Sequence, residues 1–256
     1  RRRAMELPKP RHRGYYLLPN MMTMASLLSG FLGMLWSIDG RFEMAALAVI
    51  VSCVFDGLDG KLARLTNSAS DFGVQLDSLA DLVAFGAAPA LMIYQWQTHA
   101  FGRLGIMASF LVIACGALRL ARFNVQTGKI SKKFFIGLPI PAAACTLASF
   151  VFFSSYIPEN MAVWLPGVTL ALAFLVSILM VSNVRYASFK DGEMLRAHRF
   201  SATVTALLLF VLVASEPKLL GFLFFVGYIF SGLFHTYFIL PLRGRSLLRD
   251  SSQKMP

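Results

Sequence analysis

The stretch DGLDGKLARLTNSASDFGVQLDSLAD, residues 56–81, sets the architecture because it gathers charge inside an otherwise apolar chain. It holds five of the 13 carboxylates in 256 residues, whereas 57% of all residues are hydrophobic and only 14% are charged. Soluble domains contain about 45–50% apolar residues and about 25% charged residues. Together with a mean hydropathy of +0.64, this composition indicates a membrane protein.

Apolar runs on both sides of this stretch recur at roughly the 20 residues that a helix needs to cross a bilayer. Five runs are close to that length: residues 20–38, 138–157, 160–184, 200–215 and 219–242. Three shorter runs reach it only with their polar neighbours: residues 44–55, 82–93 and 104–118. The shorter runs could instead be buried helices of a soluble core, but the apolar sequence around them argues against this. We predict an all-α polytopic membrane protein of about eight transmembrane helices, forming a single domain over residues 1–256.

The Lys and Arg residues gather on one side of the predicted bundle. That side holds 21 of the 24 cations, including those of a basic, amphipathic lead-in (residues 1–19) and of the tail (residues 243–256). Because cytoplasmic loops carry the excess of Lys and Arg, we expect both termini in the cytoplasm and the protein in the bacterial inner membrane. The net charge of +11 is spread over many loops, so no nucleic-acid partner is expected.

Four of the acids are expected at one membrane depth. Asp56 and Asp59 end the second predicted helix, and Asp77 and Asp81 lie in the first turns of the third. Spacings of three and four residues place each pair on one helix face. Four bare carboxylates there would repel one another and cost on the order of several kcal/mol each. Clustered oxygens suit hard divalent cations, so these acids predict a metal site.

A solvated loop rim is the alternative interpretation of these acids. It suits Asp71, which we interpret as the N-cap of the third helix, next to Ser70. It does not suit Asp77 and Asp81, because the apolar sequence LVAFGAAPALMIY follows them at once.

Small residues accompany the acids, and together they form the pattern D-x-x-D-G-x-x-A-R, eight residues, then G-x-x-x-D-x-x-x-D. This pattern is identical to the signature of the CDP-alcohol phosphatidyltransferase family, which the chain therefore resembles. The matching positions are Asp56, Asp59, Gly60, Ala63, Arg64, Gly73, Asp77 and Asp81.

The resemblance implies an enzyme in which the hydroxyl of a small alcohol attacks the β-phosphorus of a CDP-linked lipid and CMP is released. It implies two divalent cations, Mg²⁺ or Mn²⁺, bound by Asp56, Asp59, Asp77 and Asp81, with Asp81 also the catalytic base. The CDP-lipid contacts that it implies are Asn20, Thr23, Asp56, Gly60, Ala63, Arg64 and Gly73. The family core has six helices, so two helices here would be an addition, and such proteins are usually homodimers.

A second stretch, GALRLARFNVQTGKISKKFFIGLPIPAAA (residues 116–144), bears on the alcohol. Its ALRLARFN and F-x-G-L-P-x-P patterns resemble the phosphatidylserine synthase branch of the family, as does YYLLPNMMTMASLLSGF (residues 15–31). That branch joins CDP-diacylglycerol to L-serine among membrane lipids. A serine carboxylate needs a cationic partner, and Arg offers bidentate geometry. The expected serine-binding residues are Arg119, Arg122, Asn124 and Lys133, with Arg122 holding the carboxylate.

Two other functions stay open. Glycerol 3-phosphate or inositol phosphate could be the acceptor, although a phosphorylated acceptor demands a denser Arg cluster. Intramembrane acids also mark cation transporters. A transporter typically carries its acids near the midplane, often in two related halves, whereas the second half of this chain has no counterpart of the four acids.

Overall fold

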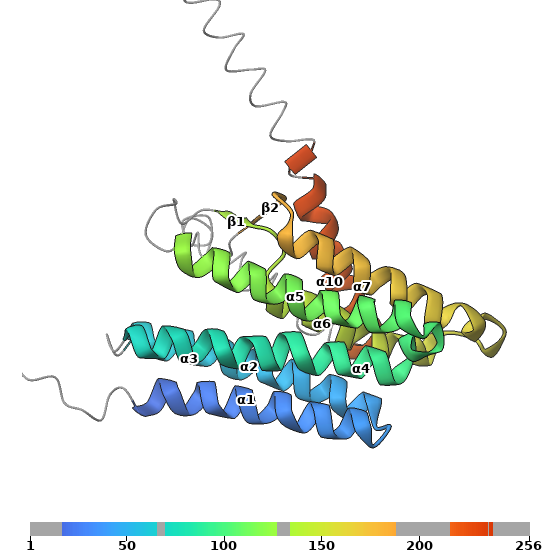
Figure 1. Ribbon diagram of the computed structural model, residues 1–256, viewed down its shortest axis with the longest axis horizontal. Coiled ribbons are helices and arrows are strands. Elements are labelled where there is room, and N and C mark those ends of the chain that lie inside the picture. Colours follow the sequence, from blue (N-terminus) through green and yellow to red (C-terminus); the bar gives the residue numbers. More distant parts are fainter. Residues whose placement is uncertain (1–16, 66–69, 127–133, 188–215, 235, 238–256) are drawn as a thin grey trace, which may run out of the picture.

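The computed structural model describes residues 17–65, 70–126, 134–187, 216–234 and 236–237 (Figure 1). Its α-helices run back and forth along one long axis. They are α1 Leu17–Ile38, α2 Phe42–Leu65, α3 Asp71–Asp81, α4 Ala88–Trp96, α5 Arg103–Gln126, α6 Ile140–Phe153, α7 Leu165–Val181 and α10 Pro217–Phe234. Short 3-10 turns follow at η3 Thr98–Phe101, η4 Ser154–Tyr156 and η5 Glu159–Trp164, and η2 Leu82–Ala87 is a π-helical segment.

Five helical segments are long and apolar enough to cross a membrane: Leu18–Ile38, Phe72–Trp96, Arg103–Val125, Glu159–Val181 and Pro217–Phe234. Helix α2 is not among them because any long window of it includes motif charges, and α6 belongs to the shorter apolar helix Ile140–Tyr156. The mostly helical membrane architecture is confirmed. The span predicted at residues 200–215 lies outside the described residues, so the count of eight and the cytoplasmic termini stay predictions.

The first two helices form a tight hairpin through small and hydroxylated residues. Ser29 Oγ donates to the Ala48 carbonyl at 2.8 Å, and Ser26 Oγ lies 2.7 Å from Ser52 Oγ. Gly30 faces the next helical segment so closely that a Cβ added there would lie 2.6 Å from Ala84 Cα. Small residues at such positions let helix backbones approach one another in a membrane. This packing brings the end of α2 and the beginning of α3 together.

The third predicted helix is continuous but not regular. Between α3 and α4 the chain makes the π-helical segment η2, which begins directly after Asp81 and buries Ala84, Phe85 and Gly86. One such turn changes the register between the face that carries the acids and the apolar face of α4. π-Helical turns occur frequently at functional sites.

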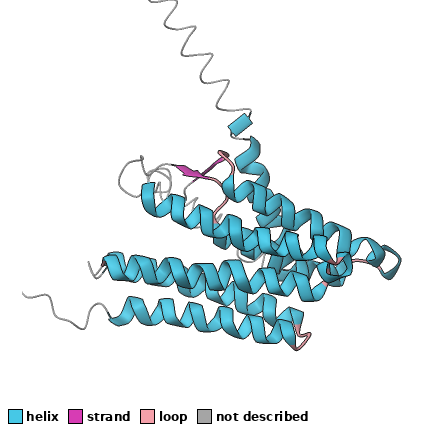
Figure 2. Cartoon of the chain, viewed as in Figure 1, coloured by secondary structure: helices cyan, strands magenta, loops and turns pink. Residues whose placement is uncertain are grey.

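Two three-residue strands, β1 Phe134–Ile136 and β2 Arg185–Ala187, pair antiparallel with Phe135 opposite Tyr186 (Figure 2). The sequence patterns do not indicate these strands. Gly137 follows β1 with a φ of 81°, and a Cβ there would lie 2.3 Å from the Met180 carbonyl oxygen. The strand pair therefore ties the α5–α6 connection to the end of α7.

Helix α10 extends along the bundle beside this pair. At its first turn Lys218 forms a salt bridge of 2.9 Å with Glu43 on α2. Toward its other end Gly232 packs against the Tyr186 ring on β2, where an added Cβ would lie 2.2 Å from Cε1. The motif, the strand pair and this end of α10 lie at the same end of the molecule (Figure 1).

Candidate active site

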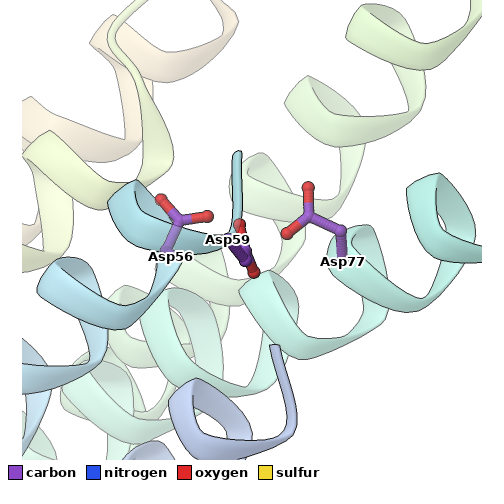
Figure 3. A group of neighbouring side chains, drawn as sticks. All are labelled: Asp56, Asp59 and Asp77. Atoms are coloured by element: carbon purple, nitrogen blue, oxygen red, sulfur yellow. The ribbon is translucent and has the colours of Figure 1, made fainter. Parts of the chain in front are cut away.

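Three motif carboxylates converge between α2 and α3. Asp56 and Asp59 project from α2 and Asp77 from α3, and Figure 3 shows their carboxylates in the space between the two helices. One oxygen from each lies within 4.8 Å of the other two. Asp59 is buried, with 6% of its surface exposed, and the other two are half-buried. Three of the four acids that were expected to converge therefore lie together.

This donor set fits divalent metal ions. Carboxylate oxygens are the ligands that Mg²⁺, Mn²⁺ and Ca²⁺ prefer. Each metal–oxygen bond measures about 2.0–2.6 Å, so two oxygens within 4.8 Å of each other can share one ion. Three neighbouring carboxylates that are buried or half-buried also need cations to offset their negative charge.

Asp81 lies at the edge of this group rather than in it. It is the last residue of α3, one turn beyond Asp77. Its carboxyl is within hydrogen-bonding reach of Asp56 and interacts electrostatically with the Arg119 guanidinium of α5. Asp81 therefore interacts both with the three carboxylates and with a buried cation. A base at this position can face an acceptor molecule and the metal-binding group together.

Thr23 holds one of the carboxylates in place. It is buried on α1, and its Oγ1 lies 2.8 Å from Asp59 Oδ2 and 3.2 Å from the Pro19 carbonyl oxygen. The shorter contact is the charge-assisted hydrogen bond, in which the hydroxyl donates to the carboxylate. The family resemblance suggests Thr23 as a CDP-lipid contact, whereas its hydroxyl here is engaged with Asp59.

Substituting Thr23→Val should weaken metal binding without removing a ligand. Valine has nearly the same shape but cannot donate to Asp59. Hydrogen bonds that orient metal ligands are typically worth about 10- to 100-fold in metal affinity or activity. We expect the Mn²⁺ concentration for half-maximal CMP release to rise by about that factor. The control is Ser26→Ala, because Ser26 bonds Ser52 one turn further along α1. An unchanged Mn²⁺ dependence in Thr23→Val would contradict the assignment.

The small residues of the motif differ in the space around them. A Cβ on Gly73 would lie 3.2 Å from Ser70 Oγ and 3.4 Å from Asn20 Oδ1, so this position is closely packed and Asn20 lies next to the start of α3. Gly57 is exposed and has no atom within 4 Å of its Cβ position, and Gly60 is half-buried. The side chains of Ala63 and Arg64 lie outside the described part of the chain.

The N-cap of α3 is Ser70, so the prediction that Asp71 caps this helix is wrong. Ser70 has the extended backbone of a cap, with φ −128° and ψ 152°, and its Oγ accepts the Gly73 N–H at 3.0 Å. Asp71 is already the first helical residue. Both residue types cap helices well, and the glycine three residues after Ser70 lets the chain turn tightly around its hydroxyl.

The four residues predicted to bind the serine acceptor differ in their burial and in their hydrogen-bond partners. Arg119 is buried on α5, its guanidinium lies 5.9 Å from the Phe123 ring centre, and it interacts with Asp81. Arg122 donates from Nη2 to Asn183 Oδ1 at 2.8 Å. Asn124 donates from Nδ2 to Ser78 Oγ at 2.9 Å, beside Asp77 on α3. Lys133 lies outside the described residues. Arg119 is therefore the cation that the structure brings to the acids.

Two further tyrosines have no signal in the sequence. Tyr186 on β2 is fully buried, and Tyr228 on α10 interacts electrostatically with Arg119. Their rings lie 5.3 Å apart, and only the fold brings these two segments together.

Comparison with known proteins supports this site. The CDP-alcohol phosphatidyltransferase family model matches residues 16–175. A CDP-diacylglycerol–serine O-phosphatidyltransferase of Helicobacter pylori (strain ATCC 700392 / 26695) is 44% identical over 179 residues, covering 68% of this chain and 73% of that protein. An archaetidylserine synthase of Methanothermobacter thermautotrophicus is 38% identical over 174 residues, covering 67% of this chain and 70% of that protein.

A CDP-diacylglycerol–serine O-phosphatidyltransferase of Bacillus subtilis is 34% identical over 173 residues, covering 68% of this chain and 91% of that protein. The family model covers all eight signature positions and the three converging carboxylates. The chain therefore belongs to the CDP-alcohol phosphatidyltransferase family.

Proposed function

We propose that this protein transfers the phosphatidyl group of CDP-diacylglycerol to the hydroxyl of L-serine, giving phosphatidylserine and CMP. The observation that carries this is the position of Arg119, a buried cation beside Asp81 at the edge of the three-carboxylate group. An acceptor with both a hydroxyl and a carboxylate suits this site, because Asp81 can take the hydroxyl proton and Arg119 can bind the carboxylate. The names of the Helicobacter pylori and Bacillus subtilis relatives point to the same acceptor.

In the reaction, the serine oxygen forms a bond to the β-phosphorus, and the bond from that phosphorus to the bridging oxygen of CMP breaks. Asp81 takes the hydroxyl proton, and CMP leaves with the bridging oxygen. Two divalent cations, Mg²⁺ or Mn²⁺, bound by Asp56, Asp59, Asp77 and the neighbouring Asp81, would neutralise the diphosphate and stabilise the charge on CMP. Thr23 keeps Asp59 oriented throughout.

The nucleotide would lie along the small residues of the motif. Gly57 has open space around its Cβ position next to Asp56, and Asn20 borders Gly73 from α1. By the family resemblance Gly60 faces the nucleotide, where a larger side chain would collide with it. Ala63 and Arg64 complete the nucleotide site by the family resemblance.

Arg119 would hold the serine carboxylate, because its guanidinium is buried and interacts electrostatically with Asp81. Arg122 and Asn124 would shape the pocket by tying α5 to Asn183 and to Ser78. Lys133 is a further cation in the α5–α6 connection and would add to the attraction for the carboxylate.

The site would face the cytoplasm in a bacterial inner membrane, where both substrates are available. The supporting feature is the charge asymmetry of the chain, with 21 of 24 cations assigned to that side. We further propose that residues 1–256 form one catalytic membrane domain, surrounded by membrane lipids and working as a homodimer.

An acceptor panel tests this function. Purified protein with CDP-diacylglycerol and Mg²⁺ or Mn²⁺ receives L-serine, glycerol 3-phosphate, inositol phosphate or water, and both CMP and lipid product are measured. We expect CMP release with serine at least about tenfold faster than with any other acceptor, the factor set by one charge-assisted contact. Equal or faster turnover with a phosphorylated acceptor would overturn serine. Cation uptake into proteoliposomes without CMP release would instead support the transporter.

A further inference from the structure

A cavity lies at the end of the bundle away from the motif, beside the turn between α1 and α2 (Figure 1). Its volume is about 320 Å³, and its lining includes Arg41, Phe42, Glu43, Met44, Trp96 and Val151. Phe42 and Asp56 stand 14 positions apart on α2, which is about 21 Å at 1.5 Å per residue. The cavity is therefore separate from the three-carboxylate group.

The cavity lies at the depth where the helices leave the apolar layer. The candidate spans Leu18–Ile38 and Phe72–Trp96 both end beside it, and Trp96 is itself part of the lining. The candidate span Pro217–Phe234 begins at the same end, because its Lys218 reaches Glu43. Tryptophan is enriched at the level of lipid headgroups. A molecule in this cavity would thus meet both the headgroup layer and the apolar layer of the bilayer.

Arg41 supplies a cation without a carboxylate partner. Its guanidinium lies 6.0 Å from the Trp36 ring centre. The only ion pair within the described part of the chain joins Lys218 to Glu43, so it does not include Arg41. The planar fork of a guanidinium matches the oxygens of a phosphate.

Glu43 supplies an anion held in place on the same cavity. Its Oε1 accepts a hydrogen bond of 2.9 Å from Lys218 Nζ, and that ammonium lies 6.0 Å from the Phe152 ring centre. A carboxylate has about four acceptor positions on its two oxygens. Glu43 can therefore accept from a second ammonium group while Lys218 stays bound.

We infer that this cavity binds an aminophospholipid from the leaflet opposite the motif. Arg41 binds its phosphate, Glu43 binds its primary ammonium group, and the apolar side chains of the lining contact the first carbons of its acyl chains: Phe42, Met44, Trp96 and Val151. The headgroup is an ethanolamine rather than a serine, because a further carboxylate would be repelled by Glu43. This inference does not depend on which alcohol the enzyme uses as acceptor.

Lipid titrations followed by native mass spectrometry test this site. Purified protein receives phosphatidylethanolamine, phosphatidylcholine or phosphatidylglycerol with identical acyl chains. Phosphatidylcholine has no N–H to donate, and phosphatidylglycerol has no ammonium group. We expect the Kd for phosphatidylethanolamine to be about tenfold lower than for the other two, the factor set by one charge-assisted contact. Equal Kd values for the three lipids would overturn the assignment.

Two substitutions divide the site into its halves. Arg41→Ala should raise the Kd of all three lipids about tenfold, because each lipid carries a phosphate. Glu43→Gln should raise only that of phosphatidylethanolamine, and the fold should persist because an exposed ion pair contributes little to stability. The matched controls are Arg103→Ala and Asp39→Asn, an exposed cation and an exposed acid outside the cavity lining, and neither should change any Kd.

CMP release should stay within about twofold of the wild type in both cavity variants, because the motif is distant from them. Unchanged lipid binding in Arg41→Ala and Glu43→Gln, or an equal loss in the two controls, would contradict the site. Soluble O-phosphoethanolamine serves as a competitor and should not displace the lipid at equal concentration, since it has no acyl chain for the apolar lining. Displacement would make the ligand a free headgroup and would overturn the lipid assignment.

Discussion

Replacing Asp77 with Asn should reduce CMP release at least about a thousandfold, and the same loss is expected for Asp56→Asn and Asp59→Asn. The three carboxylate oxygens lie within 4.8 Å of one another, so each substitution removes one negative ligand from a shared site. Stabilisation of phosphoryl charge by bound metal is worth several kcal/mol, and about 4 kcal/mol corresponds to about a thousandfold in rate. CMP release from CDP-diacylglycerol and serine, measured against Mn²⁺ concentration, gives the comparison.

The matched control is Asp39→Asn, because Asp39 is an exposed acid in the turn between α1 and α2. Its substitution should leave turnover within about twofold of the wild type, as surface changes usually do. Mn²⁺ binding, followed by electron paramagnetic resonance, supplies a readout independent of activity and should weaken only in the motif variants. Near-normal turnover of any motif variant at ordinary metal concentration would refute the shared site.

The acids could be placed from the sequence because their spacing has few structural solutions. Residues three or four apart on a helix share a face, and Asp56, Asp59 and Asp77 lie within about three turns of the short connection between two helices. Neighbouring antiparallel helices bring these turns to one depth, although α2 continues to Leu65 instead of ending at Asp59 as predicted. The apolar runs placed the helices for a similar reason, since the bilayer imposes the length of a span.

Features that depend on packing between distant segments could not be placed in this way. The π-helical turn after Asp81 has no residue signature, and the strand pair β1–β2 joins residues about fifty positions apart. Thr23 reaches Asp59 only because Gly30 and the serines of α1 let this helix approach its neighbours closely. The ring contact between Tyr228 and Tyr186 follows from the position of α10, which hydropathy does not determine.

The sequence favoured Arg122 over Arg119 as the partner of the serine carboxylate. The two residues are three apart, which favours a common direction, and the position of Arg122 in the loop after the fourth predicted span made it the expected partner. In the structure Arg122 binds Asn183, whereas Arg119 is buried beside Asp81. The two arginines differ in their burial and in the charges near them, and neither property can be predicted from their spacing in the sequence.

Replacing Asp81 with Asn should lower kcat at least about a hundredfold, the lower end for a positioned general base. Asp81 lies outside the three-carboxylate group, so CDP-diacylglycerol should still bind with its KM within about threefold of the wild type. The loss should appear in kcat because an amide cannot take the serine proton. A contact that is equally strong in the ground state and the transition state would change KM instead. Steady-state kinetics with serine varied at saturating lipid measure both constants.

The contrast between Asp81→Asn and Arg119→Lys separates the base from the acceptor contact. Lysine keeps the charge of Arg119 but loses its bidentate geometry, so the serine KM should rise about tenfold while kcat falls little. Asp39→Asn is again the control, since Asp39 is an exposed acid in the turn between α1 and α2. An Asp81→Asn enzyme that lost only nucleotide affinity would make Asp81 a ligand of the nucleotide site. A serine KM unchanged in Arg119→Lys would contradict bidentate binding of the carboxylate by Arg119, because a point charge would then serve as well as the planar guanidinium.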